Sequence, residues 1–432
     1  MTDSDVRNLA LSILIDVLEK GSFSHIAIQK ELTGRTDLTD RDKKFAMYLI
    51  RGTIQRKLTL DHILGQFSKT PLKKMKPVIR TILRMSVFQI MYMDSVPDRA
   101  VCNEAVRLTK RRGLSGLSGF VNGVLRSVVR GREEIHWPDR SDDLNEYLSI
   151  WYSMPKWLVE KWIAAYGETR CEEMLRAFQT ERSITVRPNP DKTDADQLQQ
   201  VLEKEGLICR RLSDPAYAIA ISGVTDLMSI PAFRDGLFYI QDAASMHVAE
   251  YAGAKEGDLV IDVCGAPGGK SIQIAQMLHG TGAVITRDLS DRKVALIHEN
   301  IQKMDLHNMQ AEVWDARTPD PGLEKKADIV IADLPCSGLG VTGRKAEIRY
   351  RITQDDIDAL VSLQQKILTV VSEYVKPGGA LLYSTCTVIP EENEGNANWF
   401  SDTHPGFKPV MQKQYFPSDE TDGFFIAKWE RK

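Results

Sequence analysis

Two cysteines in this chain stand where a reactive thiol would be useful. Cys336 ends the sequence DLPC, directly after one apolar run, and Cys386 lies in STCT after another. Each has polar and turn-forming neighbours, whereas a structural cysteine usually packs inside an apolar run. Because a deprotonated thiol is a strong nucleophile, the pair could carry covalent chemistry.

The remaining cysteines point to no metal centre. The six are Cys102, Cys171, Cys209, Cys264, Cys336 and Cys386. No two of them form a C-x-x-C pair, and none has a histidine at ligand spacing, so the sequence favours neither a zinc site nor a disulfide framework. We expect free thiols and no bound metal.

A glycine-rich segment, CGAPGGK, lies between an expected strand and an amphipathic helix that reaches Leu278. Such a loop lets the backbone approach a ligand closely and directs free N–H groups towards it. It is not a Walker A loop, because only three residues separate Gly265 from Gly269, and the dinucleotide pattern G-x-G-x-x-G is absent. The residues of this loop that could approach a ligand, which the family resemblance given below identifies with cofactor-contacting positions, are Cys264, Gly265, Ala266, Pro267, Gly268, Gly269 and Lys270.

Two acidic residues follow the next expected strands. Asp288 lies 18 positions after Lys270, where a carboxylate can accept hydrogen bonds from both hydroxyls of a ribose. The alternative is that Asp288 caps the helix that begins near Ser290. Asp315 follows a third strand ending at Val313 and is placed to reach an adenine amino group. Together with the loop, these acids indicate a cofactor that contains adenosine.

The elements that must position these residues alternate between strand and helix. Apolar strands are expected at 259–263, 283–286, 327–332 and 380–383, separated by amphipathic helices. This alternation predicts a Rossmann-like parallel sheet with helices on both faces. The carboxyl ends of parallel strands meet at one edge, so the loop, the acids, Asp333 and both cysteines should converge on one pocket.

The first part of the chain is of a different kind. Residues 4–132 have apolar positions at helical spacing, which predicts an all-helical bundle. Residues 1–140 contain 25 Lys and Arg against 15 Asp and Glu, whereas the remainder contains 31 against 44. This asymmetry favours a module that faces a polyanion, although a solvated helical surface is the alternative. Between the two parts, residues 183–240 are expected to form a small α+β module.

Length and composition set the outer limits. With 432 residues, 43% of them hydrophobic and 27% charged, the chain can form several domains. We expect boundaries at 1–135, 136–240 and 241–432. No apolar stretch approaches the roughly 20 residues of a membrane span, and no signal-type segment begins the chain, so we expect a cytoplasmic monomer.

Four segments carry a resemblance to a known family. CGAPGGK, DLPCSGLGV, STCTVIPEEN and DGFFIAK are similar to motifs of the RNA cytosine-5 methyltransferases of the RsmB/Sun (Fmu) type. Residues 1 to about 135 resemble the NusB-like RNA-binding domain of the same bacterial subgroup. The resemblance implies S-adenosylmethionine as cofactor and a single cytosine of 16S ribosomal RNA as substrate.

The resemblance also implies roles for individual residues. Cys386 matches the family's nucleophile and Cys336 its second, product-releasing cysteine, while Asp333 matches a cofactor-contacting position. We expect Asp333 and Lys270 to assist catalysis. Two residues depart from the family pattern. Arg287 precedes the expected ribose acid, Asp288, where the family usually has a small or apolar residue, and Leu334 replaces the commoner alanine of the Asp-x-Pro-Cys motif. Neither removes a reacting group.

The expected chemistry follows from the weak nucleophilicity of carbon 5 in cytosine. Addition of a thiolate at carbon 6 activates carbon 5, which can then accept a methyl group before the thiol is eliminated. The base must leave any stack to react, which favours an unpaired RNA loop. The expected phosphate contacts come from Arg107, Lys110, Arg111, Arg112 and Arg126.

Three alternatives remain at this point. A DNA enzyme of this chemistry uses the Pro-Cys cysteine, so the additional Cys386 favours RNA. A transfer-RNA substrate is opposed only by the NusB-like segment. An inactive RNA-binding or ribosome assembly factor is disfavoured because Asp333, Cys336 and Cys386 are all present.

Overall fold

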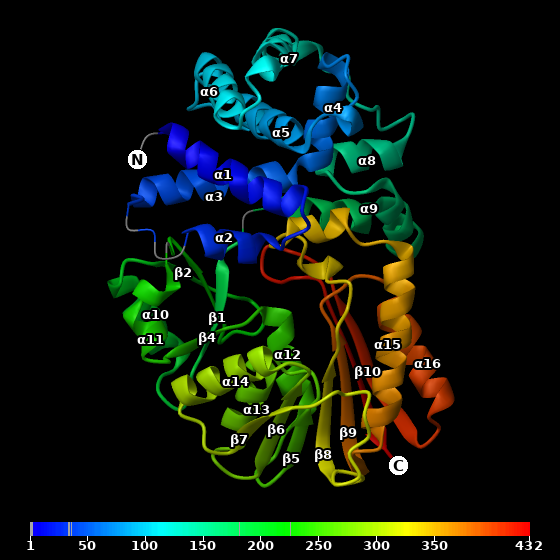
Figure 1. Cartoon of the computed structure of the whole chain (residues 1–432). Helices are drawn as coiled ribbons and strands as arrows, with labels where there is room; N and C mark the ends of the chain where they lie inside the picture. The colour runs from blue at the N-terminus through cyan, green and yellow to red at the C-terminus, as the bar shows by residue number, and fades with distance from the viewer. Residues whose placement is uncertain (1–2, 33–34, 36, 181, 225) are drawn as a thin grey trace. The chain divides into compact units, whose positions relative to one another are not determined.

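The computed structural model describes residues 3–32, 35, 37–180, 182–224 and 226–432, which form two compact units. The helical unit comprises residues 1–179 and 342–351, and the α/β unit comprises residues 180–341 and 352–432 (Figure 1). The chain therefore leaves the α/β unit once, directly after the DLPCSGLGV segment, and then returns to it. The domain boundaries at 135 and 240 stay a prediction.

The helical unit confirms the expected bundle. Its helices are α1 Asp3–Leu18, α2 Ser24–Leu32, α3 Asp40–Gln55, α4 Lys57–Phe67, α5 Pro77–Tyr92, α6 Asp98–Arg111, α7 Ser118–Arg130, α8 Leu144–Tyr152 and α9 Lys156–Gln179. Helix α5 is buried on nearly all sides and packs on α1, α3, α4, α6 and α7. Gly52 of α3 makes room for the ring of Phe88, because a Cβ there would lie 2.0 Å from that ring. Helix α9 breaks at Gly167, where φ is 80°.

Residues 342–351 complete the core of the helical unit. Ala346 and Tyr350 pack against its apolar cluster. The Tyr350 hydroxyl donates to the Gln55 carbonyl at 2.9 Å, and the Arg351 guanidinium donates to the carbonyls of Val17, Gly21 and Ser22 at 2.6 to 2.7 Å. The bundle is thus built from two separate stretches of sequence.

The α/β unit begins with the expected small α+β module. Its elements are β1 Ile184–Pro188, α10 Ala195–Lys204, β2 Ile208–Arg211, β3 Ile219–Ser222, α11 Pro231–Arg234 and β4 Phe238–Ile240. The strands form an antiparallel sheet in the order β2-β3-β1-β4. Val186, Leu198 and Phe238 are fully buried in its core.

The second sheet has seven strands in the order β10-β11-β9-β8-β5-β6-β7. Its strands are β5 Leu259–Asp262, β6 Ala283–Asp288, β7 Met309–Val313, β8 Ala327–Asp333, β9 Val375–Thr385, β10 Phe407–Tyr415 and β11 Phe424–Arg431. Strands β5 to β9 are parallel, as expected. The sheet also contains β10 and β11, which lie outside the predicted strands and pair antiparallel with each other, while β11 pairs antiparallel with β9.

Helices cover both faces of this sheet (Figure 1). They are α12 Ala243–Ala252, α13 Gly269–Met277, α14 Asp291–Met304, α15 Gln354–Ser372 and α16 Asn396–Thr403. Successive strand residues point to opposite faces. Val260 packs in the cluster with α12, α13 and α14, while its neighbour Ile261 packs in the cluster with α15 and α16. Nearly continuous apolar strands are the result of this double coverage.

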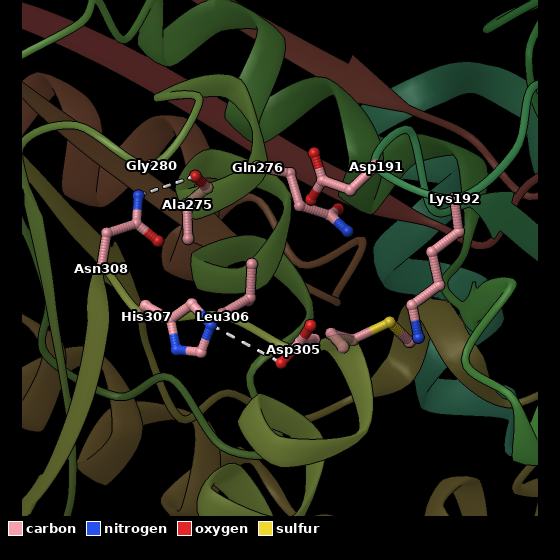
Figure 2. Close-up of a pocket in the computed structure, with 10 residues that line it drawn as sticks. Asp191, Lys192, Ala275, Gln276, Gly280, Asp305, Leu306, His307 and Asn308 are labelled. Carbon is pink, nitrogen blue, oxygen red and sulfur yellow. Dashed lines mark hydrogen bonds and ion pairs between the residues drawn. The ribbon is translucent and has the colours of Figure 1, made fainter.

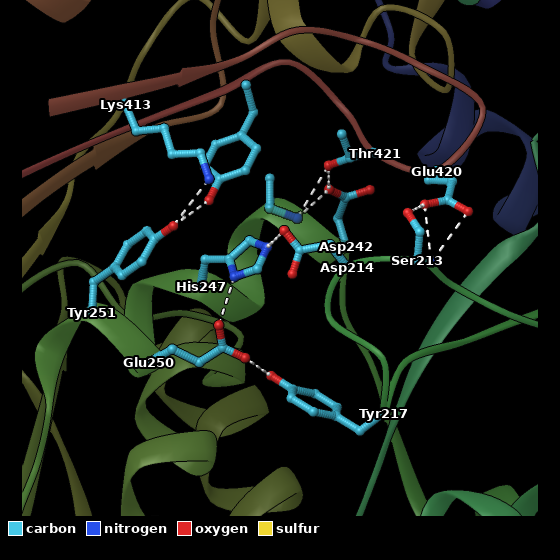
Figure 3. Close-up of polar contacts among 12 residues, drawn as sticks. Ser213, Asp214, Tyr217, Asp242, His247, Glu250, Tyr251, Lys413, Glu420 and Thr421 are labelled. Carbon is cyan, nitrogen blue, oxygen red and sulfur yellow. Dashed lines mark hydrogen bonds and ion pairs between the residues drawn. The ribbon is translucent and has the colours of Figure 1, made fainter.

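A polar network joins the small module to the second sheet (Figure 3). The buried His247 of α12 lies 2.6 Å from Glu250 and 3.4 Å from Asp214, which is in the loop between β2 and β3. The Tyr217 hydroxyl donates to Glu250 at 2.6 Å, and the His247 ring stacks on Tyr415 of β10. These contacts hold the module against the elements that carry the candidate site.

Candidate active site

The two cysteines predicted to react lie side by side. Cys336 follows β8 and Cys386 follows β9, and these adjacent parallel strands pair with Asp333 opposite Ser384. The two Sγ atoms are 3.4 Å apart, and both side chains are partly buried. The convergence expected at the carboxyl edge is therefore present in the structure.

Lys270 and Asp333 join the cysteines at the same edge. The Lys270 ammonium donates to Asp333 at 2.6 Å, and the Ser384 hydroxyl donates to the other Asp333 oxygen at 2.7 Å. Lys270 also lies over the ring of Phe424, 5.1 Å from its centre. The Lys270 ammonium is thus held near the thiol pair by the Asp333 carboxylate and by the face of the Phe424 ring.

The charges around the thiols differ. The hydrogen bond with Cys386, together with burial, raises the pKa of Cys336 well above its usual value, so this thiol is neutral at neutral pH. Burial alone would lower the pKa of Lys270, but the charge and hydrogen bond of Asp333, with further contributions from Asp262 and Cys386, raise it. Lys270 is therefore a permanent ammonium that interacts electrostatically with Cys386.

The glycine-rich loop forms an open cradle at the start of α13. Gly268 precedes this helix with φ 108°, a conformation that glycine adopts readily, and within the described chain no side chain caps the helix. A Cβ at Gly265 would lie 2.4 Å from Thr286 and 2.8 Å from the Asp262 carboxyl. The uncapped N–H groups and the tight packing suit a close-lying anionic or polar ligand.

The loop is fixed from several directions. The Gly265 N–H donates to the Arg287 carbonyl at 2.9 Å, and the Pro267 carbonyl accepts hydrogen bonds from Tyr239 and Asn300. Burial raises the pKa of Cys264, so this cysteine in the loop is a neutral thiol.

The two acids proposed for the nucleoside are at the expected strand ends. Asp288 is buried and accepts hydrogen bonds from the Leu289 and Ala266 backbone N–H groups, while Lys293 lies 3.0 Å away. Next to it, Leu289 is 62% exposed, an unusual state for leucine that a flat apolar ligand such as adenine would relieve. Asp315 is bound by Arg317 at 2.6 Å and is therefore not a free acceptor.

The sequence interpretation missed several buried polar residues at the site. Asp262, which ends β5, accepts a hydrogen bond from Ser271 at 2.5 Å, and burial raises its pKa to about 7. Asp262 Oδ1 and Thr286 Oγ1 are buried without a partner among the described residues. These atoms lie at the strand ends beside the glycine loop, which is where a cofactor with polar groups fits. The sequence signal that could have identified Asp262 is an acidic residue at the end of an apolar run.

The two departures from the family pattern have local explanations. Arg287 is nearly buried, pairs with Glu312 and Asp320 at 3.0 and 2.6 Å, and stacks on Trp314. Leu334 is buried in the apolar cluster under α15. Both substitutions affect packing rather than the reacting groups.

A separate hollow of about 250 Å³ lies away from these residues (Figure 2). It is lined by Asp191 and Lys192 of the small module, by Gln276 of α13, and by residues such as His307 in the connection between α14 and β7. It contains none of the predicted site residues. Among the described residues, no three His, Cys, Asp or Glu side chains gather to hold a metal, and no helix could span a membrane.

The second sheet is seven-stranded and Rossmann-like, a glycine-rich loop follows its first strand, and two thiols face each other at one edge. Together these features define a methyltransferase class. Comparisons with known proteins agree. Residues 251–430 match the family described as "16S rRNA methyltransferase RsmB/F", residues 4–130 match the NusB family, and residues 154–227 match an RsmF/B-like ferredoxin-like domain.

Full-length relatives extend this agreement. The chain is 34% identical to a "Probable ribosomal RNA small subunit methyltransferase B" of Bacillus subtilis, with all of both chains covered. It is 31% identical to the protein of the same description from Synechocystis, with 98% of both covered. The solved structure of PH0851 has a similar fold, with a TM-score of 0.83 and 24% identity over 100% of this chain and 99% of that one.

The chain therefore belongs to the RsmB/F family of ribosomal RNA methyltransferases. The expected cofactor, S-adenosylmethionine, is confirmed with this membership. The helical NusB-type segment, the small α+β module and the Rossmann-like domain were expected from the sequence, and the family match describes the α+β module as ferredoxin-like.

Proposed function

We propose that this methyltransferase forms 5-methylcytosine at one unpaired cytosine of 16S ribosomal RNA through a covalent adduct with Cys386. The observation that carries the proposal is the 3.4 Å separation of the Cys336 and Cys386 sulfur atoms at one strand edge. A methyltransferase that acts on an amino or hydroxyl group needs no thiol nucleophile. Cytosine carbon 5 does need one, because the ring must first receive electrons.

The roles of the two thiols follow from their surroundings. Cys386 interacts electrostatically with the Lys270 ammonium, and we propose that its sulfur is the one that adds to cytosine carbon 6. The hydrogen bond with Cys386 and its own burial keep the Cys336 thiol neutral, so Cys336 suits a step that follows the attack on the base. After methyl transfer, Cys386 is a thioether and no longer hydrogen-bonds Cys336, so a Cys336 thiolate can take the carbon 5 proton. The electron pair of that C–H bond then forms the double bond between carbons 5 and 6, and the bond between carbon 6 and the Cys386 sulfur breaks to return a thiolate. We assign Cys336 to this release.

Asp333 and Lys270 are proposed to hold the target base. Asp333 is about one quarter exposed and is fixed by Lys270 and Ser384, so its carboxylate can meet the ring N3 of cytosine. By sharing a proton with ring N3, Asp333 would offset the negative charge that thiolate addition delivers to the ring, and because it is already held in place it needs no reorganisation in that step.

S-Adenosylmethionine supplies an electrophilic methyl group when it is bound. We propose that Cys264 to Lys270 approach it through their backbone, that Asp288 accepts the ribose hydroxyls, and that Leu289 packs on the adenine. Asp315 can serve the adenine amino group only if its pairing with Arg317 is released.

The helical unit is proposed to bind the RNA backbone. Lys110 and Arg126 are exposed on α6 and α7, whereas Arg107 pairs with Glu104 and Arg111 pairs with Asp5. Arg112 is partly buried against α1. Phosphate contacts from the exposed cations would position RNA without reading its sequence. We further propose that the enzyme acts in the cytoplasm as a monomer.

Mapping of 5-methylcytosine tests the proposal. Ribosomal and transfer RNA would be sequenced after bisulfite treatment from cells with the gene, without it, and with a Cys386→Ala copy. We expect one 16S cytosine to lose its methyl group in the second and third strains. Loss confined to transfer RNA, or at a position other than carbon 5, would contradict the proposed substrate.

A further inference from the structure

A single π-helical turn, Glu391–Gly395, connects the Cys386 loop to α16. Its extra residue is accommodated by a hydrogen bond from the Gly395 N–H to the Pro390 carbonyl at 2.8 Å. Such turns are rare and are frequently found at functional sites. Here the turn directs two fully buried side chains, Glu392 and Asn393, towards the thiol pair.

Glu392 holds the loop that carries Cys336. Its Oε2 atom accepts a hydrogen bond from the Ser337 backbone N–H at 2.9 Å, at the peptide that directly follows Cys336. The same oxygen accepts from the Gln364 amide at 3.1 Å, and Gln364 also donates to the Pro335 carbonyl at 2.9 Å. The backbone is therefore bound on both sides of Cys336.

Asn393 holds the loop that carries Cys386. Its Oδ1 atom accepts from the Thr385 hydroxyl at 2.5 Å, and its Nδ2 donates to the Thr387 carbonyl at 3.1 Å. Thr385 and Thr387 are the two neighbours of Cys386 in the chain. Asn393 is anchored in turn by Gln414 of β10 at 2.7 Å.

The burial of the Glu392 carboxyl costs free energy, which argues against a purely structural role for this residue. Glu392 is completely buried, and its Oε1 atom has no hydrogen-bond partner among the described residues. Burial raises the pKa of Glu392 despite its hydrogen bonds. An apolar side chain of similar size would avoid this penalty, so a gain elsewhere must offset it.

We propose that Glu392 and Asn393 are separate positioning residues for the two thiols, with Glu392 serving Cys336 and product release and Asn393 serving Cys386 and adduct formation. The inference rests on the proposed function, since it assumes that Cys386 forms the adduct and Cys336 resolves it. Neither residue touches the reacting atoms. Each acts through the backbone of one loop.

The two residues should therefore fail at different steps. With an unmodified 16S RNA transcript and S-adenosylmethionine, Glu392→Ala should form the adduct at a rate within about twofold of wild type but release methylated RNA at least about tenfold more slowly. Asn393→Ala should slow adduct formation by a similar factor, because a shift of about 1 Å in a reacting group can cost a hundredfold. Rapid-quench sampling on denaturing gels measures both rates.

Two further variants separate positioning from stability. Glu392→Gln retains an oxygen acceptor for the Ser337 N–H and should restore release to within about threefold of wild type. Ser401→Ala, in α16, removes the acceptor of a part-buried hydrogen bond that the Trp429 indole N–H of β11 donates, without touching either loop. This control should lower the melting temperature and leave both rates unchanged. Unchanged affinity for S-adenosylmethionine would show that each variant is folded.

The outcomes distinguish this inference from the proposed function. Equal slowing of both steps in Glu392→Ala and Asn393→Ala, or full activity in both, would overturn the assignment of one residue to each thiol. If the wild-type enzyme methylates the transcript without forming any adduct, the covalent mechanism itself fails, and the positioning inference fails with it. A Glu392→Gln variant as slow as Glu392→Ala would exclude the backbone hydrogen bond as the means of action.

Discussion

The sulfur atoms of Cys336 and Cys386 lie 3.4 Å apart, although 49 residues separate them in the chain. Two adjacent parallel strands produce this contact, since both cysteines follow the carboxyl ends of β8 and β9. The proposed attack on the base and its later release would therefore take place in one small region. The different environments of the two thiols make their roles separable by experiment.

Substitution of each cysteine should give opposite gel patterns. Cys386→Ala should abolish both methyl transfer and the covalent RNA adduct, because no thiolate remains to attack carbon 6. Cys336→Ala should permit addition and methylation but trap the methylated adduct. Denaturing electrophoresis with labelled RNA should show a retarded band for Cys336→Ala alone. The reverse pattern would make Cys336 the nucleophile.

Mild oxidation should inactivate the enzyme reversibly. Hydrogen peroxide would convert Cys386 to a sulfenic acid with release of water, and the Cys336 thiol would then displace a second water and form a disulfide. The sulfur atoms need to approach only to about 2 Å. Dithiothreitol should cleave the disulfide and restore activity in the wild type, whereas Cys336→Ala should form no disulfide on the same treatment. Mass spectrometry that finds no linked peptide would contradict the geometry.

Removal of the proposed ribose acid should weaken cofactor binding. Asp288→Ala should raise the dissociation constant for S-adenosylmethionine about 10- to 100-fold, as expected for the loss of hydrogen bonds to a charged group. Asp291→Ala, an exposed acid at the start of α14, is the matched control. Calorimetric titration measures both. Equal affinity in the two variants would place the ribose elsewhere.

Asp262 should make stability fall as pH rises. Its pKa is about 7 in the folded protein, mainly because of burial, and about 4 in an unfolded chain. The folded state therefore holds a proton that the unfolded state has lost, and the free energy of unfolding decreases between about pH 4 and pH 7. Asp262→Asn should flatten this decrease in urea titrations. Parallel curves for variant and wild type would show that Asp262 does not titrate as expected.

The helical unit should supply part of the salt dependence of RNA binding. Replacing both Lys110 and Arg126 with alanine should reduce the slope of log affinity against log salt by about 1.5, because each phosphate contact contributes roughly 0.7 to 0.9. Lys366→Ala with Lys408→Ala removes two exposed charges from the α/β unit and serves as control. A larger effect in the control pair would move the RNA surface to that unit.

Local patterns were sufficient for much of the fold. The apolar runs that became β5, β6, β8 and β9 lie close to their expected positions, because strands buried on both faces are continuously apolar. The strand β10 was missed, since its edge position leaves residues such as Lys408 and Gln412 exposed. The antiparallel pairing of β10 and β11 depends on a connection that no apolar pattern reveals.

The same limit applies to the site. Cys336, Cys386 and Lys270 could be proposed because each lies at the end of a predicted strand or in a loop. The pairing of Asp315 with Arg317, and the hydrogen bonds of Glu392, depend on which side chains meet in space. Pairwise contacts of this kind cannot be inferred from residue type and spacing alone.

The second stretch of the helical unit has a consequence for the order of folding during synthesis. Residues 342–351 leave the ribosome only after most of the α/β unit has been made, yet Tyr350 and Arg351 bind α1 and the end of α3. The bundle therefore cannot reach its final packing when helices α1 to α9 emerge. The site that Tyr350 occupies in the bundle must stay unfilled until this residue has been synthesised. A premature stop before residue 342 would leave both units incomplete.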